Sequence, residues 1–330
     1  MDEPKDLDIT DCDEEPPLLF EVVPPVRGEE EKRLDQHSHY LDLLFEEIEV
    51  SALNIPEIQD EEKKGEKGKR VSPFKKRVAP RTYAKKLSER FDTDFVINRV
   101  VVKQTPEEQE RWVLETYKEY DISNIIFVGG ETSRKSYNGP SVPDGNEMVK
   151  EFLDQGKLCY NDGETRPTNM TVGNICIPTR RREDFDEPDR MKIKYRSGAE
   201  FFTTQIIAEE ETPRMLLRDF ADLLNEETES SELPTLFWSF SPISSQKDVD
   251  FLRWLGVYIP EPTEEMILGS ADPAAASIDY AQSVWEKLCD FNNQLPVSFP
   301  MGINISVMGL RNFENGVRLA KDLQMVGVAD

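Results

Sequence analysis

Short β-prone apolar runs alternate with amphipathic helical segments along almost the whole chain, and this alternation restricts the fold more than any other feature. Strands are predicted at residues 18–23, 47–53, 94–102, 124–130, 172–177, 201–207 and 235–240, with an eighth inside 298–305. The intervening segments include predicted helices at 80–91, 105–120, 144–155, 187–197, 246–255, 273–292 and 311–324. Such an order indicates either a closed parallel (β/α)8 barrel or a doubly wound open sheet.

The barrel is the preferred fold, because no glycine-rich phosphate-binding turn (GxGxxG or GxxxxGK[ST]) follows an early strand. A length of 330 residues also suits one large barrel better than two ordinary domains. We therefore predict a single (β/α)8 TIM barrel over residues 17–330. Residues 1–16 carry eight acids and one lysine and are predicted to be a disordered acidic tail. Residues 60–70, DEEKKGEKGKR, are predicted to be a charged loop insertion.

Charge and composition exclude several classes of function. The chain has 40 basic and 65 acidic residues, a net charge of −25, which disfavours binding to nucleic acid or to anionic membranes. Its four cysteines form no CxxC pair and are interpreted as reduced thiols. The acidic start differs from a secretory leader, and no apolar run reaches membrane-spanning length, so we expect a cytoplasmic protein. His37 and His39, two positions apart on a predicted helix, face different sides, so no metal site is predicted.

In a barrel, the reactive side chains lie at the carboxyl ends of the strands. Glu21 is the most informative of these, because it lies inside the apolar segment FEVVPP. Burying a carboxylate is costly unless it is protonated or held by partners. Glu21 is therefore either a functional acid or a core acid paired with an arginine, and the residues alone leave both interpretations open.

Other polar residues are also predicted near strand ends. Gly129 and Gly130 would let the backbone approach a ligand, and Glu131 could accept hydrogen bonds from it, although an ordinary strand-to-helix turn explains the same residues. Gln205 could form hydrogen bonds with a heterocyclic ligand, or it could be a core amide whose hydrogen bonds are satisfied within the protein. Asn304 is a further candidate for substrate contact. The run 180–182, three arginines, could bind a phosphate, but pairing with surface acids explains it better.

Three segments in order, FEVVPP (20–25), IIFVGGE (125–131) and EPDRMKIKYRSGAEFFTTQII (187–207), resemble landmarks of the methylenetetrahydrofolate reductase family. The resemblance implies reduction of 5,10-methylenetetrahydrofolate to 5-methyltetrahydrofolate in one-carbon metabolism and methionine supply, with NADH or NADPH as hydride donor. It implies that Glu21 is the general acid and that Glu131 and Gln205 contact the folate substrate. It also assigns Gly129, Gly130 and the lysines Lys192 and Lys194 to cofactor binding.

The resemblance fails where that family contacts its flavin, FAD. The segment after the predicted second strand reads SALNIPE, and the segment ICIPTRRREDFDEP replaces the loop that follows the family's fifth strand. We therefore expect little or no bound flavin, as in the flavin-independent members that this chain resembles. Two alternatives remain: a folate- or pterin-dependent methyltransferase acting on a corrinoid protein, and a non-catalytic barrel subunit. Hydride-donor consumption distinguishes the first from a reductase, and a homo-oligomer is compatible with the sequence.

Overall fold

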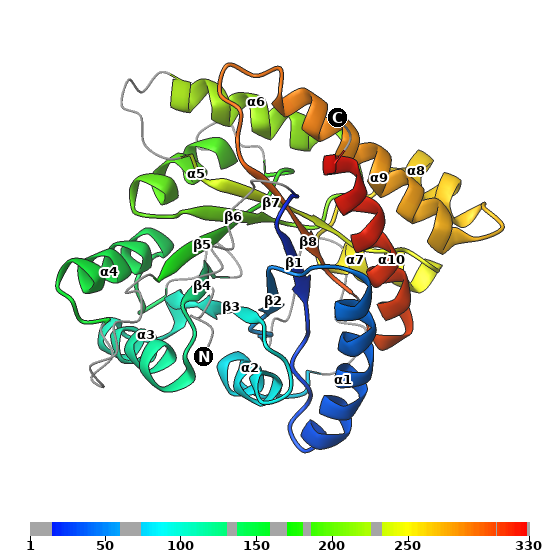
Figure 1. Ribbon diagram of the computed structural model, residues 1–330. Coiled ribbons are helices and arrows are strands. Elements are labelled where there is room, and N and C mark those ends of the chain that lie inside the picture. Colours follow the sequence, from blue (N-terminus) through cyan, green and yellow to red (C-terminus); the bar gives the residue numbers. More distant parts are fainter. Residues whose placement is uncertain are drawn as a thin grey trace.

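Eight parallel strands close into a barrel in chain order, β1 to β8, in the computed structural model (Figure 1). The structure describes residues 15–59, 74–130, 137–158, 170–180, 186–225, 233–307 and 309–328. The predicted (β/α)8 fold is confirmed. The strands are β1 (Leu18–Glu21), β2 (Ala52–Ile55), β3 (Asp94–Val100), β4 (Asn124–Val128), β5 (Thr171–Cys176), β6 (Phe201–Thr204), β7 (Thr235–Phe240) and β8 (Met301–Ile305). The predicted tail, except for its last two residues, and the predicted insertion lie outside the described residues.

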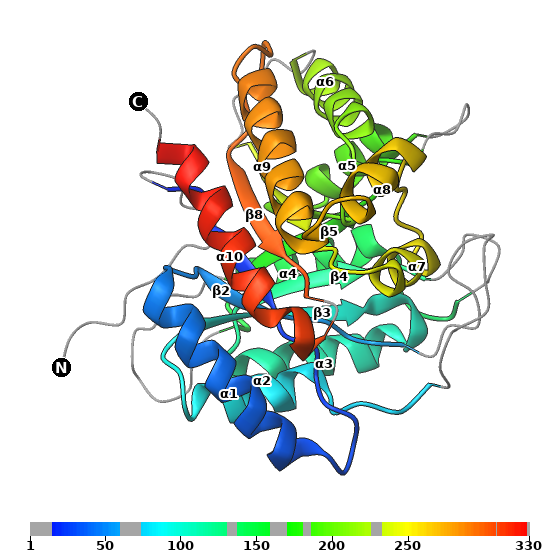
Figure 2. The same cartoon turned by 90° about the vertical axis from the view of Figure 1, so that its right-hand side faces the viewer.

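Helices follow the strands and surround the barrel, and α1, α10 and α9 lie side by side on one flank (Figure 2). The α-helices are α1 (Glu30–Glu47), α2 (Pro80–Ser88), α3 (Pro106–Tyr120), α4 (Val142–Asp154), α5 (Glu187–Arg196), α6 (Glu211–Asn225), α7 (Gln246–Trp254), α8 (Glu261–Leu268), α9 (Pro273–Asn292) and α10 (Phe313–Gln324). Short 3-10 helices are η1 (Val101–Lys103), η2 (Leu310–Asn312) and η3 (Met325–Val328). Among the described residues, none of the helices combines the length and the apolar character needed to cross a bilayer.

Three sequence-based assignments are corrected by the structure. The second strand was predicted at 47–53, but helix α1 continues to Glu47 because Leu41, Leu44 and Ile48 extend its apolar face at helical spacing, and β2 begins only at Ala52. Helix α8 was not predicted, although Pro260 precedes it and an acid opens its first turn. Strand β6 ends at Thr204, so the predicted strand at 201–207 is too long.

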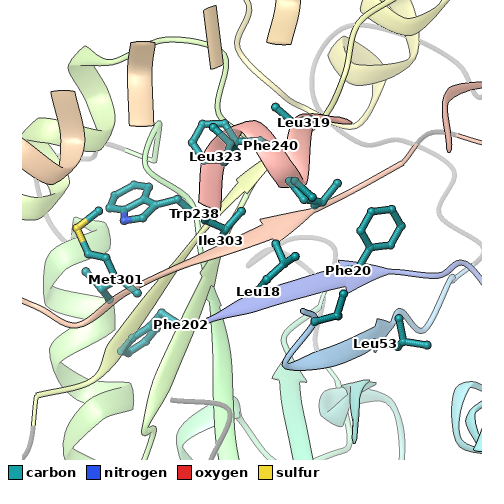
Figure 3. Close-up of a cluster of buried hydrophobic side chains, with 14 of the residues drawn as sticks. Leu18, Phe20, Leu53, Phe202, Trp238, Phe240, Met301, Ile303, Leu319 and Leu323 are labelled. Carbon is teal, nitrogen blue, oxygen red and sulfur yellow. The ribbon is translucent and has the colours of Figure 1, made fainter. Parts of the chain in front are cut away.

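Alternation along the strands divides the core into an inner and an outer layer. Outward side chains pack against the helices, as Figure 3 shows for Phe20, Ile303 and Trp238 of three strands together with Leu319 and Leu323 of α10. This outer layer is the largest cluster of buried apolar residues in the described part of the chain.

The inner layer fills the barrel. It consists of buried apolar side chains from six strands, namely Leu19, Ala52, Val96, Ile126, Phe201 and Phe237. Two glycines make room for the phenylalanines: a Cβ at Gly173 would lie 2.3 Å from the ring of Phe201, and one at Gly302 would lie 2.5 Å from that of Phe237. Side chains therefore fill the half of the barrel at the amino ends of the strands, and a ligand has to enter from the carboxyl end.

Candidate active site

A layer of polar side chains lies above the apolar inner layer, toward the carboxyl ends of the strands. Residues two positions further along each strand point to the same side, and ladder partners share a face. Glu21 pairs with Asn54 across β1 and β2, and Ser239 pairs with Asn304 across β7 and β8. This polar layer consists of Glu21, Asn54, Asn98, Thr203, Ser239 and Asn304. Its residues come from β1, β2, β3, β6, β7 and β8, so it lines most of the barrel mouth.

Glu21 is the single acid of the polar layer, and the structure places it at the last position of β1, where it is partly buried. Its Oε2 accepts a hydrogen bond of 3.1 Å from the hydroxyl of Ser306, directly after β8. The amide of Val22 donates to the carbonyl of Asn54 at 2.9 Å, which fixes the end of β1 against β2. A carboxyl group is thereby fixed at the mouth of the barrel, where the sequence predicted a functional acid.

A chain of hydrogen bonds connects the polar layer beneath Glu21. Asn54 Nδ2 donates to Asn304 Oδ1 at 3.2 Å, and Asn304 Nδ2 donates to Ser239 Oγ at 2.9 Å. Ser239 Oγ in turn donates to the carbonyl of Thr204 at 2.7 Å. Both ends of the Asn304 amide thus bond to neighbouring strands, so Asn304 lies in the floor of the mouth, and its proposed contact with substrate stays a prediction.

Three buried oxygen atoms in the same layer, one of them Asn98 Oδ1, have no hydrogen-bond partner among the described residues. The other two are Asn54 Oδ1 and Thr203 Oγ1, and both of these residues are only 2% exposed. Asn54 and Thr203 were not predicted as site residues. Amides and hydroxyls are common in strands, and only the strand bounds show whether their side chains point into the barrel. Correct bounds for β2 and β6 would have found them.

Gln205 was predicted to lie inside a strand, but the structure places it just after β6. Its Nε2 donates to the carbonyl of Leu255 at 2.9 Å, and its side chain is only partly buried. It lines a small hollow, open to solvent, together with Ile207, Glu209 and the half-exposed ring of Tyr258. Gln205 therefore belongs to the carboxyl end of the barrel, and its carbonyl oxygen is an acceptor suited to a polar ring.

The segment after β4 is described only in part. Gly129 and Gly130 follow β4 at the carboxyl end, and a Cβ at Gly130 would lie 2.1 Å from the ring of Tyr137, so glycine at this position allows the close approach of that ring. Glu131 lies outside the described residues. The assignments of these three residues to ligand binding stay predictions.

Lys192 and Lys194 are not brought together with Glu21. Lys192 Nζ donates to the carbonyl of Leu223 at the end of α6. Lys194 Nζ donates to the carbonyl of Ile175 at 2.7 Å and lies 3.6 Å from Glu187, on the helix side of the barrel wall. Burial lowers the pKa of Lys194, and the neighbouring Glu187 carboxylate opposes that change. This geometry gives both lysines structural contacts, and their predicted cofactor contact stays a prediction.

Two arginines on the mouth loops are each paired with a buried acid. Arg180 after β5 donates to Glu187 at 3.1 Å; this acid is fully buried, whereas the sequence predicted pairing with surface acids, and residues 181 and 182 lie outside the described residues. Arg311 after β8 bonds to Asp248, which is 1% exposed. Burial alone would raise the pKa of Asp248, but hydrogen bonds from Ser244 and from Arg311 hold this pKa below its usual value. The Asp248 carboxylate thus ties the loop after β7 to the loop after β8.

Histidine and cysteine contribute no second reactive centre in the part of the chain that the structure describes. His37 is buried and His39 is exposed, which confirms that they face different sides of α1. Cys176 and Cys289 are free thiols, and burial raises the pKa of each of them. No cluster of three or more histidine, cysteine, aspartate or glutamate side chains suited to a metal occurs among the described residues.

Fold and site together define a (β/α)8 barrel whose carboxyl-end mouth places Glu21 beside the amide and hydroxyl side chains of the polar layer. The sequence matches no protein-family model and no curated protein. The fold is similar to that of an uncharacterized protein from Clostridium thermocellum that binds two copies of 5-methyl-5,6,7,8-tetrahydrofolic acid. That likeness has 20% identity and a TM-score of 0.72, and it covers 95% of this chain and 96% of the other.

More distant barrels share the fold at lower similarity. A riboflavin lyase with modified FMN and riboflavin has 10% identity, a TM-score of 0.51 and coverage of 96% and 93% of the two chains. A long-chain alkane monooxygenase has 10% identity, a TM-score of 0.52 and coverage of 96% and 92%. At these identities the comparisons show the barrel fold.

Proposed function

We propose that this protein binds a reduced folate in the barrel mouth and reduces 5,10-methylenetetrahydrofolate to 5-methyltetrahydrofolate with NADH or NADPH. The observation that carries the proposal is the placement of Glu21, which is held by Ser306 at the carboxyl end of the barrel. The similar fold of a protein that binds 5-methyltetrahydrofolate supports the choice of a folate as ligand.

The polar layer offers the groups that a pterin ring requires. A pterin presents ring nitrogens, an amino group and a carbonyl along one edge, so it needs both donors and acceptors. Gln205 supplies an amide at the mouth, and Thr203 and Asn54 supply buried acceptors without partners among the described residues. A ligand whose donors reached these acceptors would satisfy groups that are costly to leave unpaired.

The chemistry assigned to Glu21 is one proton transfer. Its carboxyl proton goes to N10 of the folate, the bond between N10 and the methylene carbon breaks, and an N5 iminium forms. The nicotinamide supplies a hydride to the methylene carbon, which gives the N5-methyl group and the oxidised dinucleotide. Glu21 then regains a proton from water. Because both reactants have to lie near Glu21 and Gln205 at once, the kinetics are expected to be sequential.

We further propose that the protein holds no resident flavin, whose phosphates would require cationic or backbone donors. Arg180 and Arg311, which lie on the described mouth loops, are both paired with buried carboxylates. No step is therefore assigned to FAD, and the nicotinamide is treated as a substrate that leaves after each turnover.

The decisive experiment combines binding with turnover. Titration with 5-methyltetrahydrofolate tests folate binding, and oxidation of NADH or NADPH with 5,10-methylenetetrahydrofolate tests the reaction, with the methylated product identified by mass spectrometry. Folate binding without nucleotide oxidation would contradict the reductase and favour either the methyltransferase or a non-catalytic barrel. Absence of folate binding would contradict both the reductase and a folate-dependent methyltransferase, and would leave the non-catalytic barrel. Glu46→Gln, an exposed glutamate on α1, is the matched control for Glu21→Gln.

A further inference from the structure

Ser306 donates a hydrogen bond to the Glu21 carboxyl, and its surroundings fix it in place. It is only 3% exposed, and its own amide donates to the carbonyl of Phe240 at 2.9 Å. Its hydroxyl lies 3.1 Å from Glu21 Oε2. Because the backbone of Ser306 is held by β7 and its side chain is buried, the hydroxyl has little freedom to move away from the carboxyl group.

We propose that Ser306 is the positioning residue of Glu21, orienting its carboxyl group in the barrel mouth and favouring the ionised form. A hydroxyl that donates to a carboxylate stabilises the charged form and so strengthens the acid. It also fixes the plane of the carboxyl group, and proton transfer depends steeply on that geometry. This inference rests on the proposed function only in its catalytic consequence, since the contact itself is independent of the reaction.

Ser306 and its polar neighbours differ in their hydrogen-bond partners. Asn54 and Asn304 belong to the hydrogen-bond chain beneath Glu21, and their amides bond to each other. Ser241 is also a buried serine, just beyond the end of β7, but its hydroxyl has no hydrogen-bond partner in the part of the chain that the structure describes. Ser241→Ala therefore removes the same atom from the same region without touching the Glu21 carboxyl, and it is the matched control.

The first test measures the titration of the Glu21 carboxyl group directly and needs no substrate. The full chain is labelled with 13C at the glutamate carboxyl carbons, and the signal of Glu21 is assigned by its absence in Glu21→Gln. In Ser306→Ala the titration midpoint of this signal is expected to rise by roughly one pH unit, because one donor to the carboxylate is lost. Ser306→Thr keeps the hydroxyl and is expected to keep the midpoint, as is Ser241→Ala. An unchanged midpoint in a folded Ser306→Ala protein would overturn the proposal.

The second test measures the steady-state kinetics of the proposed reaction. Ser306→Ala is expected to lower kcat about tenfold with little change in KM, to move the pH–rate profile with the carboxyl midpoint, and to be rescued by Ser306→Thr. In the Glu21→Gln background the same substitution is expected to have no further effect. An equal loss in both backgrounds would mean that Ser306 acts elsewhere, and would overturn the proposal.

The two tests distinguish the possible failures. A wild-type protein without reductase activity overturns the proposed function, while the carboxyl titration still decides whether Ser306 controls Glu21. Thermal denaturation of each variant shows whether it folds, and if Ser306→Ala does not, the comparison of Ser306→Thr with Ser306→Cys replaces it. The weaker thiol donor is then expected to raise the midpoint, and identical midpoints in the two variants would overturn the proposal.

Discussion

Replacing His37 by glutamine removes a titrating group from the interface between α1 and α2, and the structure sets the size of the effect. His37 is 6% exposed, and its Nδ1 shares a hydrogen bond of 2.7 Å with the hydroxyl of the fully buried Tyr83. Burial, together with the charges of Arg33 and Arg77, lowers the pKa of His37 from 6.5 to about 4. The folded protein therefore keeps this imidazole neutral at pH values where the unfolded chain protonates it.

The sign and magnitude follow from proton linkage. A depressed folded-state pKa gives stability that is fully present above the unfolded-state pKa and is lost as the pH falls toward the folded-state pKa. The gap of about 2.5 pH units between 6.5 and about 4 corresponds to about 3 kcal/mol at full protonation. Between pH 7 and pH 5 the expected loss is about 2 kcal/mol, before most carboxyl groups titrate.

The assay is urea denaturation at pH 7, 6 and 5, followed by circular dichroism. The free energy of unfolding of the wild type is expected to fall by about 2 kcal/mol more than that of His37→Gln over this range. His39→Gln is the matched control, because His39 is exposed on the same helix, and this variant is expected to follow the wild type. Parallel curves for the wild type and His37→Gln would refute the reasoning.

Four further predictions concern the site, the core and the termini. Glu21→Gln is expected to lower reductase turnover roughly 100-fold or more with an unchanged melting temperature, and near-normal turnover in the folded variant would exclude Glu21 as the acid. Deletion of residues 1–16 is expected to leave melting temperature and kinetics unchanged, and a loss of either would show that the segment docks. The freshly purified protein is expected to show no stoichiometric flavin absorption and no dependence on added FAD, and either result would contradict flavin-free chemistry. Gly302→Ala is expected to destabilise the fold by about 1–3 kcal/mol in urea denaturation, since the new Cβ meets Phe237 and the carbonyl of Pro17, and an unchanged free energy of unfolding would contradict that packing.

Residues whose chemistry conflicts with their local sequence could be predicted without the structure. Glu21 stands out because a carboxylate in an apolar strand requires an explanation, and the barrel supplies the position at its mouth. Asn54 is chemically ordinary in a strand, and its inward direction became visible only when β2 was shown to begin at Ala52. The apolar face of α1 runs on past Glu47, so periodicity alone misplaced the boundary by several residues.

Lys194 illustrates a limit of a different kind. Lys194 lies on α5, just before β6. From such a position a lysine side chain can reach the barrel mouth or remain behind the barrel wall, and the local sequence is compatible with both. Its burial beside Glu187 and its bond to the carbonyl of Ile175 place it behind the wall. Local sequence does not encode that choice, because it depends on how α5 rotates against β5 and on which acid is buried beside it.

The contact between Ser306 and Glu21 depends on the closure of the barrel, since the two residues are 285 positions apart and lie at the ends of the last and first strands. In an open doubly wound sheet these strands need not be neighbours, and Glu21 would then have no partner from β8. In a closed barrel β1 pairs with β8, with Leu19 opposite Asn304, so the register brings Ser306 beside Glu21. Closure of the sheet therefore determines the hydrogen-bond partner of Glu21 as well as the fold. Any change that weakens the pairing of β1 with β8 is expected to disturb the Glu21 carboxyl before it unfolds the protein.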